Sequence, residues 1–167
     1  MPQNKNKGDY FMTEKKVMLT EDGYNKLVEK LNYLKSVRRI EVAERLKAAI
    51  ALGDLSENSE YDDAKNEQGL MEARIAQIND ILSNAVLVEA PKRSNRVNIG
   101  STVTVDMGGR ERVFTIVGAA EADVSSGKIS NESPVGAALL GGKKGDHFTA
   151  EGPTGRVIEM DIVKIEH

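Results

Sequence analysis

The sequence predicts an α+β fold, in which an N-terminal antiparallel coiled-coil helical hairpin precedes a small, mostly antiparallel β-sheet domain with one short helix. Two observations predict it. Residues 24–52 contain neither Pro nor Gly, and a second helical pattern follows Gly53. After about residue 97, short alternating segments are separated by glycine-rich turns. We therefore expect a disordered tail at 1–11, the hairpin at 12–88, a linker at 89–96 and the sheet domain at 97–167.

The first predicted helix runs from Glu21 to Leu52 behind Thr20, which is a favourable N-cap residue. Leu27, Leu31 and Leu34 follow one another at steps of four and three, the spacing of a coiled-coil seam. Further apolar residues then follow at steps of three. They are Val37, Ile40, Ala43 and Leu46. This pattern predicts that the stripe drifts around the helix, as in a stammer.

The second predicted helix follows Gly53, which interrupts the first. Its apolar residues Met71, Ile75, Ile78 and Leu82 are spaced by four, three and four. Because the connection is short and neither helix can bury its stripe alone, the two helices should lie antiparallel. A helix of about 30 residues is about 45 Å long. The tip at 53–61 should therefore project from the rest of the molecule.

The C-terminal part is predicted to consist of short strands and turns. The expected elements are a strand at 102–105, a turn at 107–110, a strand at 111–117, a turn at 125–127, a short strand around Phe148, a turn at 152–155 and a last strand at 156–166. Ser133 and Pro134 suit the N-cap and first position of a short helix ending at Gly141–Gly142. In the last strand, the apolar residues change face near Ile162, which predicts a bulge.

Composition excludes several functional classes. The 167 residues include no Cys, so no disulfide framework exists, and no run of about 18 apolar residues could cross a membrane. The first eleven residues lack the apolar stretch of a secretion signal. His147 and His167 have no neighbours at zinc-site spacing. The sequence thus predicts a cytoplasmic protein that has no contact with a membrane.

Charge is unevenly distributed along the hairpin. Between Lys26 and Lys47 there are seven basic residues against three acids, whereas between Asp54 and Asp63 there are five acids and no base. A basic shaft therefore leads to an acidic tip.

Asp54 and Glu57 are the candidate ligands of a metal ion at this tip. They are three residues apart, so both carboxylates can reach one point, and such oxygens suit Mg²⁺. Two carboxylates leave a site incomplete, so the other ligands would belong to a partner or substrate. The alternative is a capping box, with Asp54 as N-cap and Glu57 behind it. Five acids at one point are more than capping requires.

The run from Gly53 to Tyr61 resembles the tip signature of the Gre family of bacterial transcript cleavage factors. Similar segments flank it and recur in the second domain, and the resemblance covers most of 12–167. These segments are Leu34–Arg39, Leu82–Ala85, Glu121–Asp123, Ile129–Ser130, Ser133–Pro134 and Ala138–Gly141.

The resemblance implies a transcription elongation factor with an FKBP-like C-terminal domain on the rim of the secondary channel of bacterial RNA polymerase. The hairpin would enter that channel and reach the extruded 3′ end of backtracked RNA. Asp54 and Glu57 would help hold a Mg²⁺ of the polymerase and its attacking water. The chain would then be an accessory factor that binds no metal alone, and not an enzyme. The alternative is a channel-binding regulator or an interaction protein that does not stimulate cleavage.

The resemblance also assigns supporting roles. It implies that Asn58, Glu60 and Tyr61 position the tip, although Tyr61 could equally pack in the helical seam or stack on a base. Ser130, Ser133 and Pro134 would contact the channel rim, or merely form a turn and a helix cap. The candidates for contact with RNA are Arg38, Arg39, Arg45 and Lys47. These bases could instead be partners of Glu41 and Glu44. Many family members carry a base just before the tip, whereas 48–52 is apolar here.

Overall fold

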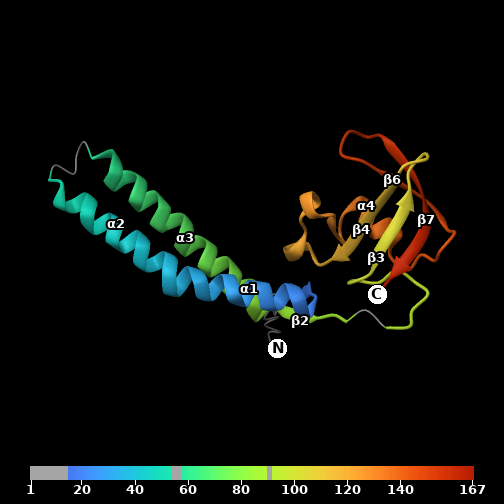
Figure 1. Ribbon diagram of the computed structural model, residues 1–167, viewed down its shortest axis with the longest axis horizontal. Coiled ribbons are helices and arrows are strands. Elements are labelled where there is room, and N and C mark those ends of the chain that lie inside the picture. Colours follow the sequence, from blue (N-terminus) through green and yellow to red (C-terminus); the bar gives the residue numbers. More distant parts are fainter. Residues whose placement is uncertain (1–14, 54–57, 90–91) are drawn as a thin grey trace, which may run out of the picture.

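The computed structural model describes residues 15–53, 58–89 and 92–167 (Figure 1). The tail predicted at 1–11 lies outside this range, as do Asp54 and Glu57. A long helical hairpin extends away from a compact sheet domain, and the two parts meet at the base of the hairpin. Within the described residues, no helix is long and apolar enough to cross a membrane.

The first arm of the hairpin is a continuous helical run in three pieces. They are α1 (Glu21–Tyr33), the π-helical turn η1 (Leu34–Arg38) and α2 (Arg39–Ala51). Thr20 is the N-cap of α1, since its hydroxyl oxygen accepts a hydrogen bond of 3.1 Å from the Gly23 N–H. The predicted helix and its cap are thus confirmed.

The predicted course of the apolar stripe is wrong beyond Leu34. Val37 and Ile40 are 40% and 57% exposed, and Ala43 is exposed as well. The buried residues are instead Val42 and Ala49. A seven-residue repeat that starts at Leu27 would reach each of these two positions one residue earlier. The π turn accommodates this single extra residue and returns the apolar face to the partner helix.

The second arm is α3 (Ser59–Ser83), which runs antiparallel to α1 and α2 (Figure 1). Its buried residues are Ala64, Met71, Ile75 and Ile78, as the predicted spacing requires for the last three. Met71, Ile75 and Ile78 form one core with Leu27, Leu31 and Val42 of the first arm. The predicted antiparallel hairpin is confirmed.

A two-stranded sheet that sequence patterning did not predict closes the base of the hairpin. β1 (Val17–Leu19) pairs in parallel with β2 (Ala85–Leu87). Leu19 is completely buried in the hairpin core. Strands of three residues are too short to display a recognisable alternation, which explains why they were missed.

The C-terminal domain is a five-stranded sheet with strand order β5-β4-β3-β7-β6. The strands are β3 (Thr102–Asp106), β4 (Glu111–Val117), β5 (Lys128–Ser130), β6 (His147–Glu151) and β7 (Val157–Glu166). All pairings are antiparallel except that of β4 with β5. Two short 3₁₀ turns, η2 (Ala119–Glu121) and η3 (Val124–Ser126), connect β4 to β5. The predicted mostly antiparallel sheet is confirmed.

The predicted bulge in the last strand is also confirmed. Thr104 of β3 pairs with Lys164, whereas the next residue, Val105, pairs with Ile162, so Val163 is the extra residue. Met160 and Ile162 face the core, where the short helix α4 (Pro134–Leu139) supplies the buried Leu139. The sheet domain thus has its own apolar core, separate from that of the hairpin.

Candidate functional site

The described residues at the tip hold the ends of the two arms together. Asn58 is the N-cap of α3, because its side-chain oxygen accepts a 3.2 Å hydrogen bond from the Tyr61 N–H. Its side-chain amide donates to the carbonyl oxygen of Ala49, on the other arm, at 2.7 Å. One side chain therefore both starts α3 and ties it to α2.

This arrangement corrects the capping alternative for the tip carboxylates. The N-cap of α3 is Asn58, four residues beyond Asp54, so the capping box proposed for Asp54 and Glu57 does not begin this helix. Asp54 and Glu57 themselves lie outside the described residues. Their predicted role as metal ligands stays a prediction.

Glu60 is engaged in an ion pair within the hairpin. Its carboxylate accepts a 2.6 Å hydrogen bond from the Arg45 guanidinium across the two arms. This hydrogen bond and the attraction between the two charges lower the pKa of Glu60 below its ordinary value. The predicted role of Glu60 in positioning the tip stays a prediction. Tyr61 is half-buried, whereas Asp62 and Asp63 are exposed.

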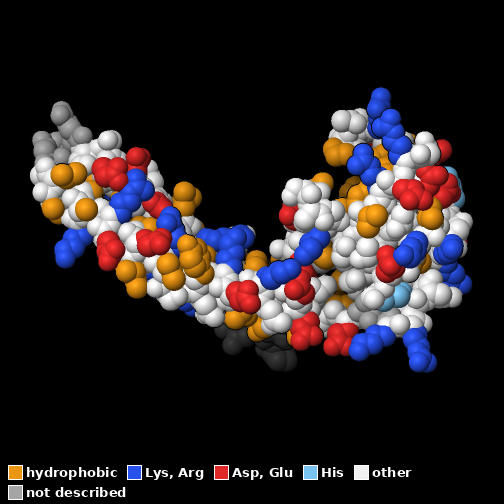
Figure 2. Space-filling model, in the orientation of Figure 1, with side chains coloured by type: hydrophobic (Ala, Val, Ile, Leu, Met, Phe, Trp, Pro, Cys, Tyr) orange, Lys and Arg blue, Asp and Glu red, His pale blue; other side chains and the backbone are white. Residues whose placement is uncertain are grey.

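The basic shaft is partly neutralised by glutamates of α3. Arg39 donates two hydrogen bonds of 2.7 Å to Glu72, and Arg45 contacts Glu67 at 2.7 Å. Arg38 pairs with Glu67 as well. Acidic and basic side chains accordingly alternate along the hairpin (Figure 2). Exposed pairs of this kind are weak, so the guanidinium groups can exchange their partners at small cost.

Sequence reasoning missed the role of Glu67, which bridges two arginines of the other arm. The signal was present, because Arg38 and Arg45 are seven residues apart and so are Glu60 and Glu67. Opposite charges repeated at seven residues on two antiparallel helices indicate pairs across a coiled coil. The alternative that the shaft bases pair along their own helix holds for Arg38, which also contacts Glu41 at 2.7 Å.

The residues predicted to contact the channel rim form a tightly bonded turn. The Ser133 hydroxyl accepts a hydrogen bond from the Gly136 N–H at 3.1 Å and donates one to the carbonyl oxygen of Ser130 at 2.7 Å. Pro134 occupies the first turn of α4. The predicted cap is confirmed, and the turn presents a fixed surface at the edge of the sheet domain. Contact with a partner stays a prediction.

Among the described residues, no group of three or more His, Cys, Asp and Glu side chains is arranged to hold a metal ion. The described residues thus supply hydrogen bonds that join the two arms next to the tip, a row of ion pairs along the shaft and a sheet domain at the far end.

Comparison with known proteins identifies the class. A family model described as "Transcription elongation factor, N-terminal" matches residues 17–87, and one described as "Transcription elongation factor, GreA/GreB, C-term" matches residues 91–167. The two matches together span most of the chain and therefore define a transcription elongation factor. The chain belongs to the GreA/GreB family.

Two relatives named GreA agree with this assignment and confirm the predicted resemblance. Transcription elongation factor GreA of Thermoanaerobacter pseudethanolicus is 53% identical over 154 residues, covering 90% of this chain and 98% of the relative. GreA of Acetivibrio thermocellus is 53% identical over 156 residues, covering 92% and 98%. The crystal structure of GreA factor homolog 1 of Thermus thermophilus is 33% identical, covers 92% of this chain and 100% of that chain, and has a TM-score of 0.43.

Proposed function

We propose that this chain stimulates the Mg²⁺-dependent endonucleolytic cleavage of backtracked RNA by bacterial RNA polymerase, and so restarts arrested complexes. The hairpin enters the secondary channel while the sheet domain holds its rim. The observation that carries this proposal is the set of hydrogen bonds that joins the two arms next to the tip. Asn58 and the Glu60–Arg45 pair tie the two arms together on either side of the segment that holds Asp54 and Glu57.

Asp54 and Glu57 are the residues that would hold Mg²⁺, and carboxylate oxygens are the ligands this ion prefers. Within the polymerase centre, paired metal ions stabilise the attacking and leaving oxygens of the hydrolysis. The contribution of this chain is to bring two carboxylates to that centre. It acts as an accessory factor because the remaining ligands and the RNA belong to the polymerase.

The shaft and the sheet domain supply the remaining contacts of the proposal. Lys47 is exposed on α2, and Arg38, Arg39 and Arg45 can exchange their glutamate partners for phosphates of the extruded RNA 3′ end. The Ser130–Pro134 turn faces the rim.

The test is a cleavage assay on stalled elongation complexes with the Asp54→Asn variant. Asn removes a charged ligand while keeping nearly the same size. Because the cap of α3 is Asn58, the variant should melt at the temperature of the unaltered protein while losing most of its stimulation. Shortened transcripts that require Mg²⁺ are the expected product with the unaltered chain.

The matched control is Asp63→Asn, which removes the same charge from an exposed position on α3. It should retain stimulation. Equal loss in both variants would assign the effect to overall tip charge and contradict a ligand role for Asp54. If the unaltered chain binds polymerase without shortening transcripts, it is instead a channel-binding regulator.

A further inference from the structure

The hairpin and the sheet domain are joined by a hydrogen-bonded contact that the proposed function does not use. The Glu121 carboxylate, on η2 of the sheet domain, accepts a 2.7 Å hydrogen bond from the Thr20 N–H and a 2.6 Å bond from the Thr20 hydroxyl. Thr20 is the N-cap of α1. A residue 101 positions away thus completes the N-terminal cap of the hairpin, where a negative charge is favourable.

Two glycines, one on each side of the junction, allow this close approach. A Cβ atom at Gly23 of α1 would lie 1.9 Å from the Oε1 atom of Glu121. A Cβ atom at Gly118, just before η2, would lie 1.8 Å from the carbonyl oxygen of Met18. Both surfaces are therefore shaped for each other, and larger side chains at either position would separate them.

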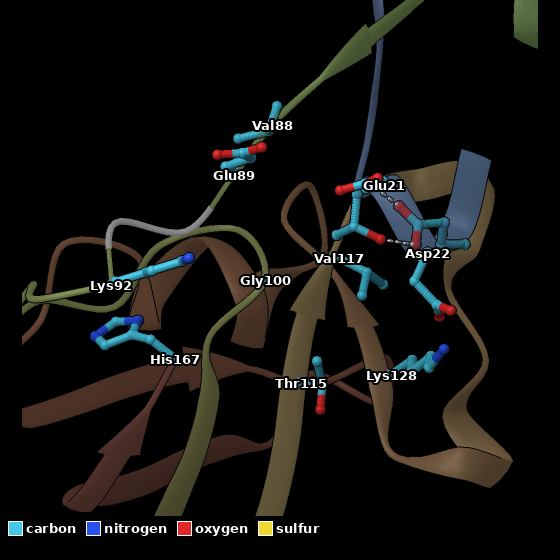
Figure 3. Close-up of a pocket in the computed structure, with 12 residues that line it drawn as sticks. Glu21, Asp22, Val88, Glu89, Lys92, Gly100, Thr115, Val117, Lys128 and His167 are labelled. Carbon is cyan, nitrogen blue, oxygen red and sulfur yellow. Dashed lines mark hydrogen bonds between the residues drawn. The ribbon is translucent and has the colours of Figure 1, made fainter. Parts of the chain in front are cut away.

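Packing supports the junction at the base of the hairpin. Ala120 of η2 packs against the hairpin core that contains the fully buried Leu19. Beside this contact, however, lies an open cleft of about 780 Å³ between the start of α1 and the sheet (Figure 3). Val88, at the end of the hairpin, and the linker residues Glu89 and Lys92 border it. Continuous packing does not extend across the cleft, so a few contacts at η2 must define the angle between the parts.

We propose that Glu121 is a positioning residue, whose contact with Thr20 holds the hairpin in one direction relative to the sheet domain. Its consequence for cleavage rests on the proposed function. An arm of about 30 residues is about 45 Å long, so a rotation of about 10° at its base moves the tip by about 8 Å. Displacements of about 1 Å already impair catalysis. Losing the contact would misplace the tip even with the sheet domain bound.

The direction of the hairpin can be measured in the full-length protein. The sequence has no Cys, so the substitutions Leu70→Cys and Val157→Cys place two spin labels without background. These positions are 74% and 65% exposed, one on the hairpin and one on the sheet. Pulsed electron paramagnetic resonance should give one narrow distance distribution, which Glu121→Ala broadens or shifts. The control Glu159→Gln, at an exposed position on β7, should leave the distribution unchanged. An unchanged distribution in Glu121→Ala would overturn the proposal.

A second variant keeps the test decisive if Glu121→Ala folds poorly. Gly23→Ala drives a methyl group into the Glu121 carboxylate, whereas Gly69→Ala on α3 meets no atom within 4 Å. Both changes raise helix propensity. Gly23→Ala should therefore broaden the distance distribution and Gly69→Ala should not, although neither weakens its own helix. Equal distributions in both would contradict the proposal.

The cleavage assay separates positioning from binding. At saturating factor, Glu121→Ala should lower the maximal cleavage rate by about tenfold or more. Broadened distances with an unchanged maximal rate would overturn the positioning role. If even the unaltered chain fails to stimulate cleavage, the proposed function fails, while the distance measurement still decides whether Glu121 orients the hairpin.

Discussion

At the scale of single residues, Asn58 shows how one side chain serves two elements. Its oxygen caps α3, and its amide nitrogen bonds the carbonyl oxygen of Ala49 at the end of α2. Aspartate could perform only the first task, since an ionised carboxylate has no donor. This dual requirement explains why position 58 is Asn and not Asp.

We expect Asn58→Ala to destabilise the protein by about 0.5–2 kcal/mol, the usual cost of losing an N-cap. Chemical denaturation should measure the loss, and amide hydrogen exchange should locate it in the first turn of α3. Asn58→Asp is the matched control because it keeps the cap and replaces the bond to Ala49 with a repulsion between two oxygen atoms. Full stability in Asn58→Ala would mean that the cap contributes nothing.

The ion pairs predict a stability that depends on pH. Hydrogen bonds from Arg45 and Arg39 lower the pKa values of Glu60 and Glu72 below the ordinary value of 4.5. A carboxyl group with a lowered pKa stabilises the folded protein above 4.5, and this contribution is lost as the pH falls through the lower folded values.

Thermal unfolding followed by circular dichroism between pH 7 and pH 3 tests this expectation. The melting temperature should fall below about pH 4.5, and less steeply in the double variant Glu60→Gln and Glu72→Gln. Because these pairs are exposed, added salt should reduce the difference between the two proteins. A double variant with the same pH dependence as the unaltered chain would remove the two pairs from the explanation.

At the scale of elements, the π turn is the device that keeps the hairpin in register. Removing one residue within η1, for example Ser36, should convert the π turn into regular α-helix and leave Val42 and Ala49 facing α3. The melting temperature should then stay the same or rise. Removing the exposed Ala43 from α2 rotates Ala49 away from α3 and should lower the melting temperature. A loss of stability on deleting Ser36 would contradict this account of the turn.

Much of the element structure was predictable because it is local. The N-caps Thr20 and Ser133, the antiparallel arms and the bulge of β7 all leave a signature within a few residues. The π turn was not predictable, because an inserted residue shifts the apolar phase without changing composition. The stripe through Ile40 looked as favourable as the stripe through Val42 that the structure buries.

The site divides in the same way. The acidic tip and the family resemblance followed from the sequence, as did Ser133 as a helix cap. The N-cap of α3 did not, since Asp54 and Asn58 are both good cap residues and only the partner arm decides between them. Glu121 belonged to a recognised segment, but its contact with Thr20 joins residues far apart, which no periodicity reveals.

At the scale of the whole molecule, the packing at the base of the hairpin contributes to the stability of the protein. Leu19→Ala should destabilise the protein by about 2–5 kcal/mol, because it leaves a cavity where the side chain is completely buried. Val17→Ala, at a partly exposed position on the same strand, is a milder control. Denaturation curves should show the difference, and similar small losses in both would indicate that the base repacks.

The strand pair at the base also dictates an order of assembly. β1 and β2 stand at opposite ends of the hairpin sequence, so pairing Val17 with Ala85 closes a long loop and comes at an entropic cost until both helices have formed. During synthesis on the ribosome, β1 can pair with β2 only after Leu87 has emerged. Thr20 can bond to Glu121 only after Glu121 has emerged as well. The direction of the hairpin relative to the sheet domain is therefore among the last features that a nascent chain acquires.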